Sequence, residues 1–179
     1  VTENYGLPCI VSINRFTFDT DKDIDLIKER MEKLGVVVVL AEHWAKGGEG
    51  AEELANEVIR LVEGSSGPSF VYEDNDSLLE KVNKVAKKIY GASDVTASAK
   101  IKKQLIDWEK AGFEKYPICI AKTQSSFSTD ATFRGAPTGH TVNIREVKLA
   151  AGAEFIVVIC GEIMTMPGLP KIPSAEKID

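Results

Sequence analysis

Two aromatic residues stand just beyond strands that the sequence predicts. Residues 36–40, Val-Val-Val-Val-Leu, are too apolar for a half-exposed strand and too short to span a membrane, so they predict a strand covered on both faces. Trp44 follows this strand, and Phe16 follows an earlier strand expected at residues 8–13. Ligands of open α/β sheets bind beyond the carboxyl ends of the strands. If the two strands are neighbours, Phe16 and Trp44 can hold a flat heterocycle between their rings, with Leu40 as the floor, unless the rings merely close the core.

The glycines that follow Trp44 precede a predicted helix. Free amides at the start of a helix attract anions, which makes Gly47–Gly50 a weak candidate for holding a phosphate. Neither a dinucleotide fingerprint nor a phosphate loop ending in Gly-Lys-Ser/Thr occurs anywhere in the chain. A flexible turn before the helix is the alternative interpretation.

Lys122 and Gln124 follow another predicted strand, at residues 117–121. A cation and an amide at a strand end can position a carboxylate or phosphate of a substrate, although a solvated loop explains the same residues. His43 and His140 are far apart, and no Cys/His/Asp spacing resembles a zinc site or a Ser/His/Asp triad. The sequence therefore predicts no metal site and assigns no catalytic residue.

The predicted elements alternate in the first half of the chain and become mixed later. After the strand at 8–13, helices are expected at 20–33, 49–62, 77–90 and 98–111, and further strands at 142–149 and 155–160, which can pair as a hairpin. This order predicts an α/β protein with open, mainly parallel sheets flanked by helices, and a second, smaller mixed α/β subdomain that contains the β-hairpin. The turn at 91–94 divides the expected subdomains into 1–92 and 93–179.

The composition limits which binding partners and which cellular compartment are expected for the protein. A formal charge of -5 and a pI near 5.2 argue against nucleic acid or an acidic membrane surface as a partner. Three unpaired cysteines in apolar runs predict buried, reduced thiols and a cytoplasmic location, and no apolar run is long enough for a membrane span. The lysine-rich stretch 81–103 is typical of solvated helix faces. The start without Met suggests that the chain is a piece of a longer protein.

Four separated motifs resemble the family of formate–tetrahydrofolate ligases, and the match spans nearly the whole chain. They occur in the family's order at residues 14–16, 42–48, 122–128 and 164–170. Residues 88–92 and 175–179 also look like that family. The resemblance is to the C-terminal third of these enzymes, whose N-terminal ATP-binding domain has no counterpart among these residues.

The resemblance implies that the parent enzyme is homo-oligomeric and uses ATP and Mg²⁺ to make formyl phosphate from formate. It then transfers the formyl group to N10 of tetrahydrofolate. It further implies that Phe16, Leu40 and Trp44 form the folate pocket, and that this chain alone is inactive because ATP is bound mainly by the N-terminal domain. Many relatives carry Pro where Thr17 stands, which would stiffen the turn that presents Phe16.

Two other functions stay open at this point. The chain could be a non-catalytic assembly or docking module of the same oligomeric enzyme. It could also be a small-nucleotide-binding α/β module, in which case the amides of Gly47–Gly50 would have to contact phosphate.

Overall fold

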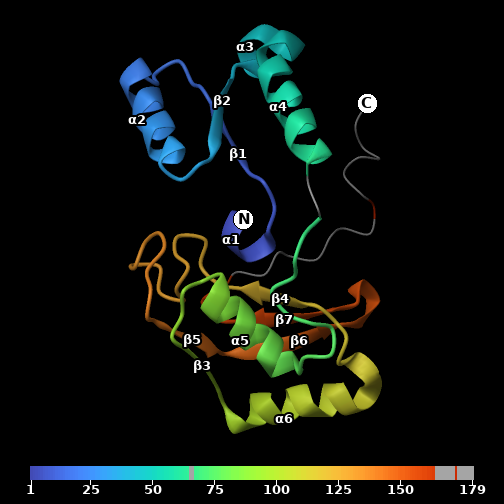
Figure 1. The fold of residues 1–179 in the computed structure, drawn as a ribbon. Helices are drawn as coiled ribbons and strands as arrows, with labels where there is room; N and C mark the ends of the chain where they lie inside the picture. The colour runs from blue at the N-terminus through green and yellow to red at the C-terminus, as the bar shows by residue number, and fades with distance from the viewer. Residues whose placement is uncertain (65–66, 164–171, 173–179) are drawn as a thin grey trace. The chain divides into compact units, whose positions relative to one another are not determined.

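The computed structural model describes residues 1–64, 67–163 and 172, and it divides the chain into two compact units, Val1–Phe70 and Val71–Asp179. Each unit is α/β, and the seven strands found among the described residues form three small sheets (Figure 1). The predicted fold class is confirmed: three of the four strand pairings are parallel, and the fourth is the antiparallel hairpin. The motif at residues 164–170 lies outside the described residues.

Unit 1 is built on a parallel pair of strands between two helices. Its elements are α1 (Thr2–Tyr5), β1 (Ile10–Asn14), α2 (Asp21–Glu32), β2 (Val37–Ala41), α3 (His43–Lys46), η1 (Gly47–Ala51) and α4 (Glu52–Glu63). Helices α2 and α4 lie on opposite sides of the β1–β2 pair (Figure 1), as the apolar sequence of β2 predicts. Among the described residues, however, β2 pairs with β1 alone, so it is not a central strand.

Helix α2 begins where the sequence predicts, because Thr20 and Asp23 cap it reciprocally. The Thr20 hydroxyl accepts a hydrogen bond from the Asp23 N–H, and the Asp23 carboxylate accepts one from the Thr20 N–H. This capping box satisfies amide groups that would otherwise have no partner at the helix start.

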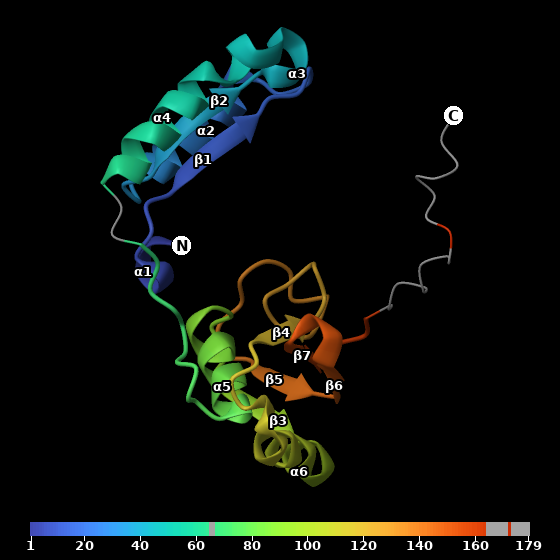
Figure 2. The ribbon, with the colours of Figure 1, turned by 90° about the vertical axis from the view of Figure 1, so that its right-hand side faces the viewer.

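Unit 2 contains the main hydrophobic core. Its elements are α5 (Leu78–Lys88), β3 (Asp94–Ala97), α6 (Ala99–Trp108), η2 (Glu109–Phe113), β4 (Ile118–Ala121), β5 (Thr141–Ile144), β6 (Glu146–Ala150), η3 (Ala151–Ala153) and β7 (Phe155–Ile159). Helix α5 packs near β3 and β4, and α6 packs near β6 (Figure 2). The core joins both helices to the strands through Leu78, Val82, Leu105, Val142, Ile156 and Val158.

The division between the units comes earlier than residue 92. Helix α5 contributes Leu78, Val82 and Ala86 to the core of unit 2, so the residues from Val71 onward belong with that unit. Lys81 on the same helix is buried, which corrects the expectation that this lysine-rich stretch only faces solvent.

Three local features differ from the sequence-based elements. Strand β3 begins at Asp94, the last residue of the expected boundary turn, and its four residues, which no predicted strand covers, pair in parallel with β5. The single strand expected at 142–149 is two strands. Its first part, β5, pairs with β3 up to Ile144, and its second part, β6, pairs with β7 from Glu146. Of the cysteines, Cys160 is buried as expected, whereas Cys9 is half-buried and Cys119 is exposed.

Candidate functional site

The carboxyl ends of β1 and β2 lie side by side at one edge of the unit 1 sheet. Asn14, the last residue of β1, is the register partner of Ala41, the last residue of β2. The parallel pairing expected from the sequence therefore brings the segments that carry Phe16 and Trp44 to the same edge.

A tight turn presents Phe16 immediately after β1. The Phe16 N–H donates to the Asp19 carboxylate at 2.7 Å, and the Asp19 N–H donates back to the Phe16 carbonyl at 3.1 Å. Both bonds hold the backbone of the residue that carries the ring. The Phe16 side chain itself is 60% exposed and free to meet a ligand.

The indole of Trp44 is tied to the end of β1. Its Nε1–H donates to the Arg15 carbonyl at 2.6 Å, which joins α3 to the residue directly before Phe16. Trp44 is 57% exposed, and within the described part of the chain its ring makes no contact with that of Phe16. Two exposed rings are thus held at one sheet edge without covering each other, an arrangement that can accept a flat molecule.

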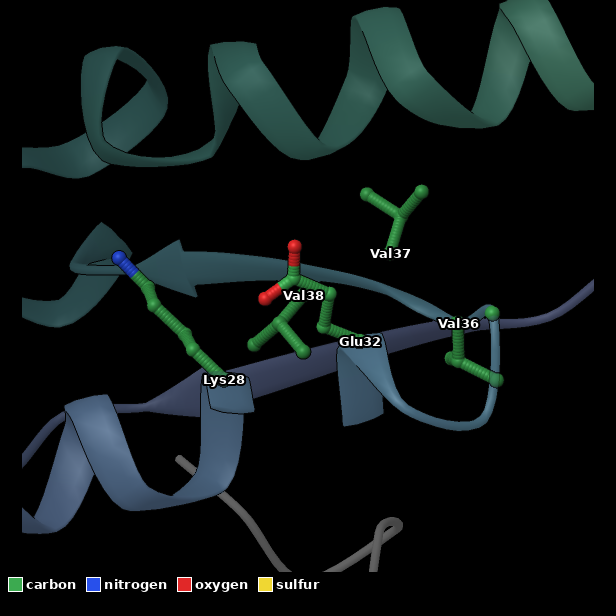
Figure 3. A pocket seen from close by; sticks show the side chains of 6 residues that line it. Lys28, Glu32, Val36, Val37 and Val38 are labelled. Carbon is green, nitrogen blue, oxygen red and sulfur yellow. The ribbon is translucent and has the colours of Figure 1, made fainter. Parts of the chain in front are cut away.

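Leu40 lies on the face of the sheet toward α2. In Figure 3 the side chain of Val37 points toward α4 and that of Val38 toward α2. Side chains alternate along a strand, so Leu40 shares the α2 side with Val38. The turn that carries Phe16 leads into α2, and the half-buried Leu40 therefore supplies apolar surface on the side where that turn runs.

Two exposed ion pairs flank the aromatic residues. Arg15 pairs with Asp21 at 2.8 Å, and Lys46 pairs with Glu42 at 2.6 Å. The hydrogen bond from Lys46 lowers the pKa of the Glu42 carboxyl, and the same bond raises the pKa of Lys46. Exposed pairs of this kind contribute little to stability.

Gly50 has a fixed structural role that the sequence reading missed. The Gly50 carbonyl accepts a hydrogen bond from the Glu42 N–H at 3.0 Å, and a Cβ on Gly50 would lie 2.5 Å from the Glu42 carbonyl carbon and 2.7 Å from the His43 nitrogen. The turn η1 is therefore packed against the backbone that leads into Trp44. At Gly50, unlike at Gly47 and Gly48, the expected flexible turn makes a close backbone contact that only glycine permits.

We expect Gly50→Ala to disturb the aromatic site and Gly48→Ala to leave it intact. The added methyl at position 50 collides with backbone atoms and must displace α3, whereas a Cβ at position 48 meets nothing within 4 Å. Overpacking of this kind costs about 1–3 kcal/mol. Thermal unfolding and near-ultraviolet circular dichroism of the two variants compare the effects, and equal behaviour of both variants would contradict the role given to Gly50.

Lys122 is held by its own loop in unit 2. Its ammonium donates to the carbonyls of Ser126 and Thr123, the latter at 3.3 Å, and lies 4.8 Å from the ring centre of Tyr90 and 5.3 Å from that of Phe127. Burial lowers its pKa. These contacts fix the start of the long loop before β5.

Gln124 lies at the mouth of a separate polar cavity of unit 2. The cavity is bordered by Asn143 of β5 and by residues that follow β4, β5 and β7, including Arg145 and Glu162. Gln124 is exposed there, and Lys122 is not among the lining residues. The structure thus places Phe16, Leu40 and Trp44 in unit 1 and the two candidate positioning residues in unit 2.

Metal ligands do not cluster within residues 1–64 and 67–163, where no three His, Cys, Asp or Glu side chains could share an ion. No helix in that part of the chain is long and apolar enough to cross a membrane.

The Arg15 carbonyl and the Asp19 carboxylate are the site residues that the sequence analysis missed. A main-chain acceptor has no sequence signal, because every residue carries one. Asp19 did have a signal: an Asp three residues after Phe16 is a common turn residue.

Comparison with known proteins gives one consistent result. The family model for formate–tetrahydrofolate ligase matches residues 1–179. The formate–tetrahydrofolate ligase of Methylibium petroleiphilum is 56% identical over 183 residues, covering 100% of this chain and 33% of the relative. Those of Methylobacillus flagellatus and Methylococcus capsulatus are 53% and 55% identical, each over 100% of this chain and 32% of the relative. The chain spans about a third of the length of these curated relatives, and it belongs to the formate–tetrahydrofolate ligase family.

Proposed function

We propose that this chain contributes the tetrahydrofolate-binding pocket of an ATP-dependent ligase that makes 10-formyltetrahydrofolate from formate and tetrahydrofolate. The observation that carries the proposal is the pair of exposed, separately anchored rings at one sheet edge. The family membership supplies the flat ligand, a pterin, that such a pair can hold.

Each residue has a distinct part in binding. Trp44 stacks on one face of the pterin while its indole N–H stays on the Arg15 carbonyl, and Phe16 covers the other face from its turn. Each stack contributes on the order of 1 kcal/mol beyond the burial of apolar area. Leu40 adds apolar contact on the α2 side, and Gln124 remains a candidate for positioning a polar group of a substrate.

Phosphoryl chemistry is expected from polypeptide outside this chain. The reaction implied by the family transfers the γ-phosphoryl group of ATP to formate, and N10 of tetrahydrofolate then displaces phosphate from the formyl carbon. Family membership implies ATP and Mg²⁺, which we assign mainly to the N-terminal domain of a cytoplasmic homo-oligomer.

A fluorescence titration tests the folate assignment. The chain has two tryptophans, and Trp108→Phe leaves Trp44 as the only indole. We expect tetrahydrofolate to quench Trp44 in a saturable manner, whereas ATP should not, because the proposed ligand of the two rings is a pterin. Quenching by ATP with phosphate-dependent affinity would favour the nucleotide-binding alternative. The absence of any tetrahydrofolate effect would contradict the proposal and leave the assembly role as the better account.

A further inference from the structure

The outer edge of β1 presents main-chain groups without a strand partner. The Arg15 N–H donates to the Ala41 carbonyl of β2, so the odd-numbered residues of β1 turn their peptide groups toward β2. Because successive residues of a strand turn their peptide groups to alternate sides, the N–H and C=O groups of Ser12 and Asn14 point to the outer edge of β1. In the described part of the chain β1 pairs with β2 alone, and a two-stranded sheet is marginal by itself.

A wholly apolar groove lies between β1 and α4. It encloses about 360 Å³ and is lined by Leu7, Pro8, Ile10, Leu54, Val58, Leu61 and Val62. Val58 and Val62 remain 45% and 66% exposed, although α4 is strongly amphipathic. Few side chains of unit 1 are fully buried, namely those of Ile24, Val39 and Ala41 among the apolar residues. The groove is therefore core-forming surface that no described element of unit 1 covers.

The outer edge of β2 differs from the outer edge of β1 in the side chains that lie beside it. Figure 3 shows Lys28 and Glu32 of α2 beside the start of β2, where they line a hollow with residues 35–38. Charged side chains at a sheet edge oppose the addition of another strand. The contrast favours the β1 edge for strand addition.

Topology points to the same edge. Helices α2 and α4 lie on opposite sides of the sheet, and parallel crossovers are right-handed. A crossover through α4 would place the next parallel strand beside β1. The chain instead runs from α4 into unit 2, and no described strand occupies that position.

We propose that an apolar strand from the polypeptide that extends the relatives beyond the matched third pairs in parallel with the outer edge of β1. Its side chains on the α4 side fill the groove of Val58 and Val62. The relatives carry about two thirds of their length outside the match, which supplies ample chain for such a strand. A strand covered by helices in this way is continuously apolar rather than alternating.

Amide hydrogen exchange tests the pairing. The two proteins compared are the 179-residue chain and a full-length hybrid in which this chain replaces the matched segment of the Methylibium ligase. Ser12 and Asn14 should exchange rapidly in the chain and about 100-fold more slowly in the hybrid, because a paired edge amide opens only with its sheet. Val11 and Ile13, which face β2, serve as internal references. Equal exchange of Ser12 and Asn14 in both proteins would overturn the proposal.

Other occupants give different results. Protection of Ser12 in the chain alone that grows with protein concentration would identify a second copy. Protection that is independent of concentration would identify a segment of this same chain. Either result overturns the proposed occupant.

A pair of neighbouring substitutions tests the groove. Val58→Lys places a charge in the groove, whereas Ile59→Lys changes an adjacent residue of α4 that is 58% exposed and does not line it. In the hybrid, Val58→Lys should remove the protection of Ser12 and Asn14 while Ile59→Lys preserves it. Both variants should behave alike in the 179-residue chain. Retained protection in the Val58→Lys hybrid would refute the groove as the docking surface, whatever its effect on folate binding.

Discussion

Replacing Trp44 by alanine is expected to weaken tetrahydrofolate binding by about ten- to a hundredfold, since loss of a stacking ring typically costs about 1–3 kcal/mol. The effect should be large because Trp44 is held in place before the ligand arrives. Its indole N–H bond to the Arg15 carbonyl fixes the ring at the sheet edge, so little ordering remains to be done on binding. ATP affinity of the full-length hybrid should not change. Isothermal titration of the hybrid with each ligand provides the measurement.

Two comparisons separate stacking from other effects. Trp44→Phe keeps a ring but loses the bond to Arg15, and we expect an intermediate affinity. On the opposite side of the clamp, Phe16→Ala should weaken folate binding, whereas Phe18→Ala should not. Asp19 holds the backbone of Phe16, but Phe18 lies two residues further along the chain and is 94% exposed. If Phe16→Ala and Phe18→Ala have the same affinity as the unsubstituted protein, the clamp is refuted.

Replacing Lys81 by alanine is expected to lower the free energy of unfolding of unit 2 by about 3 kcal/mol or more. Lys81 is 0% exposed, and its ammonium donates to the carbonyls of Glu114 at 2.7 Å and Tyr116 at 3.2 Å. It also lies 5.6 Å from the ring centre of Tyr72. The substitution removes both donors from buried acceptors and leaves a cavity beside α5. Urea denaturation followed by circular dichroism measures the loss.

Lys87 provides the matched control on the same helix. It is exposed near the end of α5, so Lys87→Ala should change the unfolding free energy by less than about 0.5 kcal/mol. Lys81→Met keeps the volume of the aliphatic part of the side chain but removes the hydrogen-bond donors. Its unfolding free energy should lie between those of Lys81→Ala and Lys87→Ala. Equal stability of Lys81→Ala and Lys87→Ala would show that the buried contacts contribute nothing.

The pH dependence of the Lys81 effect has a defined sign. Burial lowers the pKa of Lys81 below its ordinary value of 10.5, so the folded state disfavours the charged form. This penalty is fully present below the folded pKa and is relieved as pH rises toward 10.5. The stability difference between the unsubstituted chain and Lys81→Met should therefore increase as pH approaches 10.5. A difference that shrinks over that range would contradict a buried, desolvated ammonium.

Strong local patterns predicted most elements correctly, and weak ones account for the differences. The apolar run before Leu40 and the cap at Thr20 have clear physical signatures, and both β2 and α2 occur where expected. Strand β3 alternates polar and apolar residues, but its four residues are too few for that alternation to stand out in the sequence. The break at Arg145 did carry a signal, because Arg145 and Glu146 are two consecutive polar residues that interrupt the alternation between β5 and β6.

The sequence by itself determined the family resemblance, the α/β class and the position of Phe16 and Trp44 just beyond two predicted strands, whereas the structure showed that these strands pair. Residue types and strand periodicity are properties of the local chain, so they can be recognised in the sequence without knowledge of the fold. Only the tertiary structure showed that the Trp44 indole is tied to the Arg15 carbonyl, that Gly50 must lack a Cβ, and that Lys81 is buried while Lys87 is exposed. Each of these features depends on a contact between a residue and the backbone of another segment. The residues next to it in the sequence do not specify that contact.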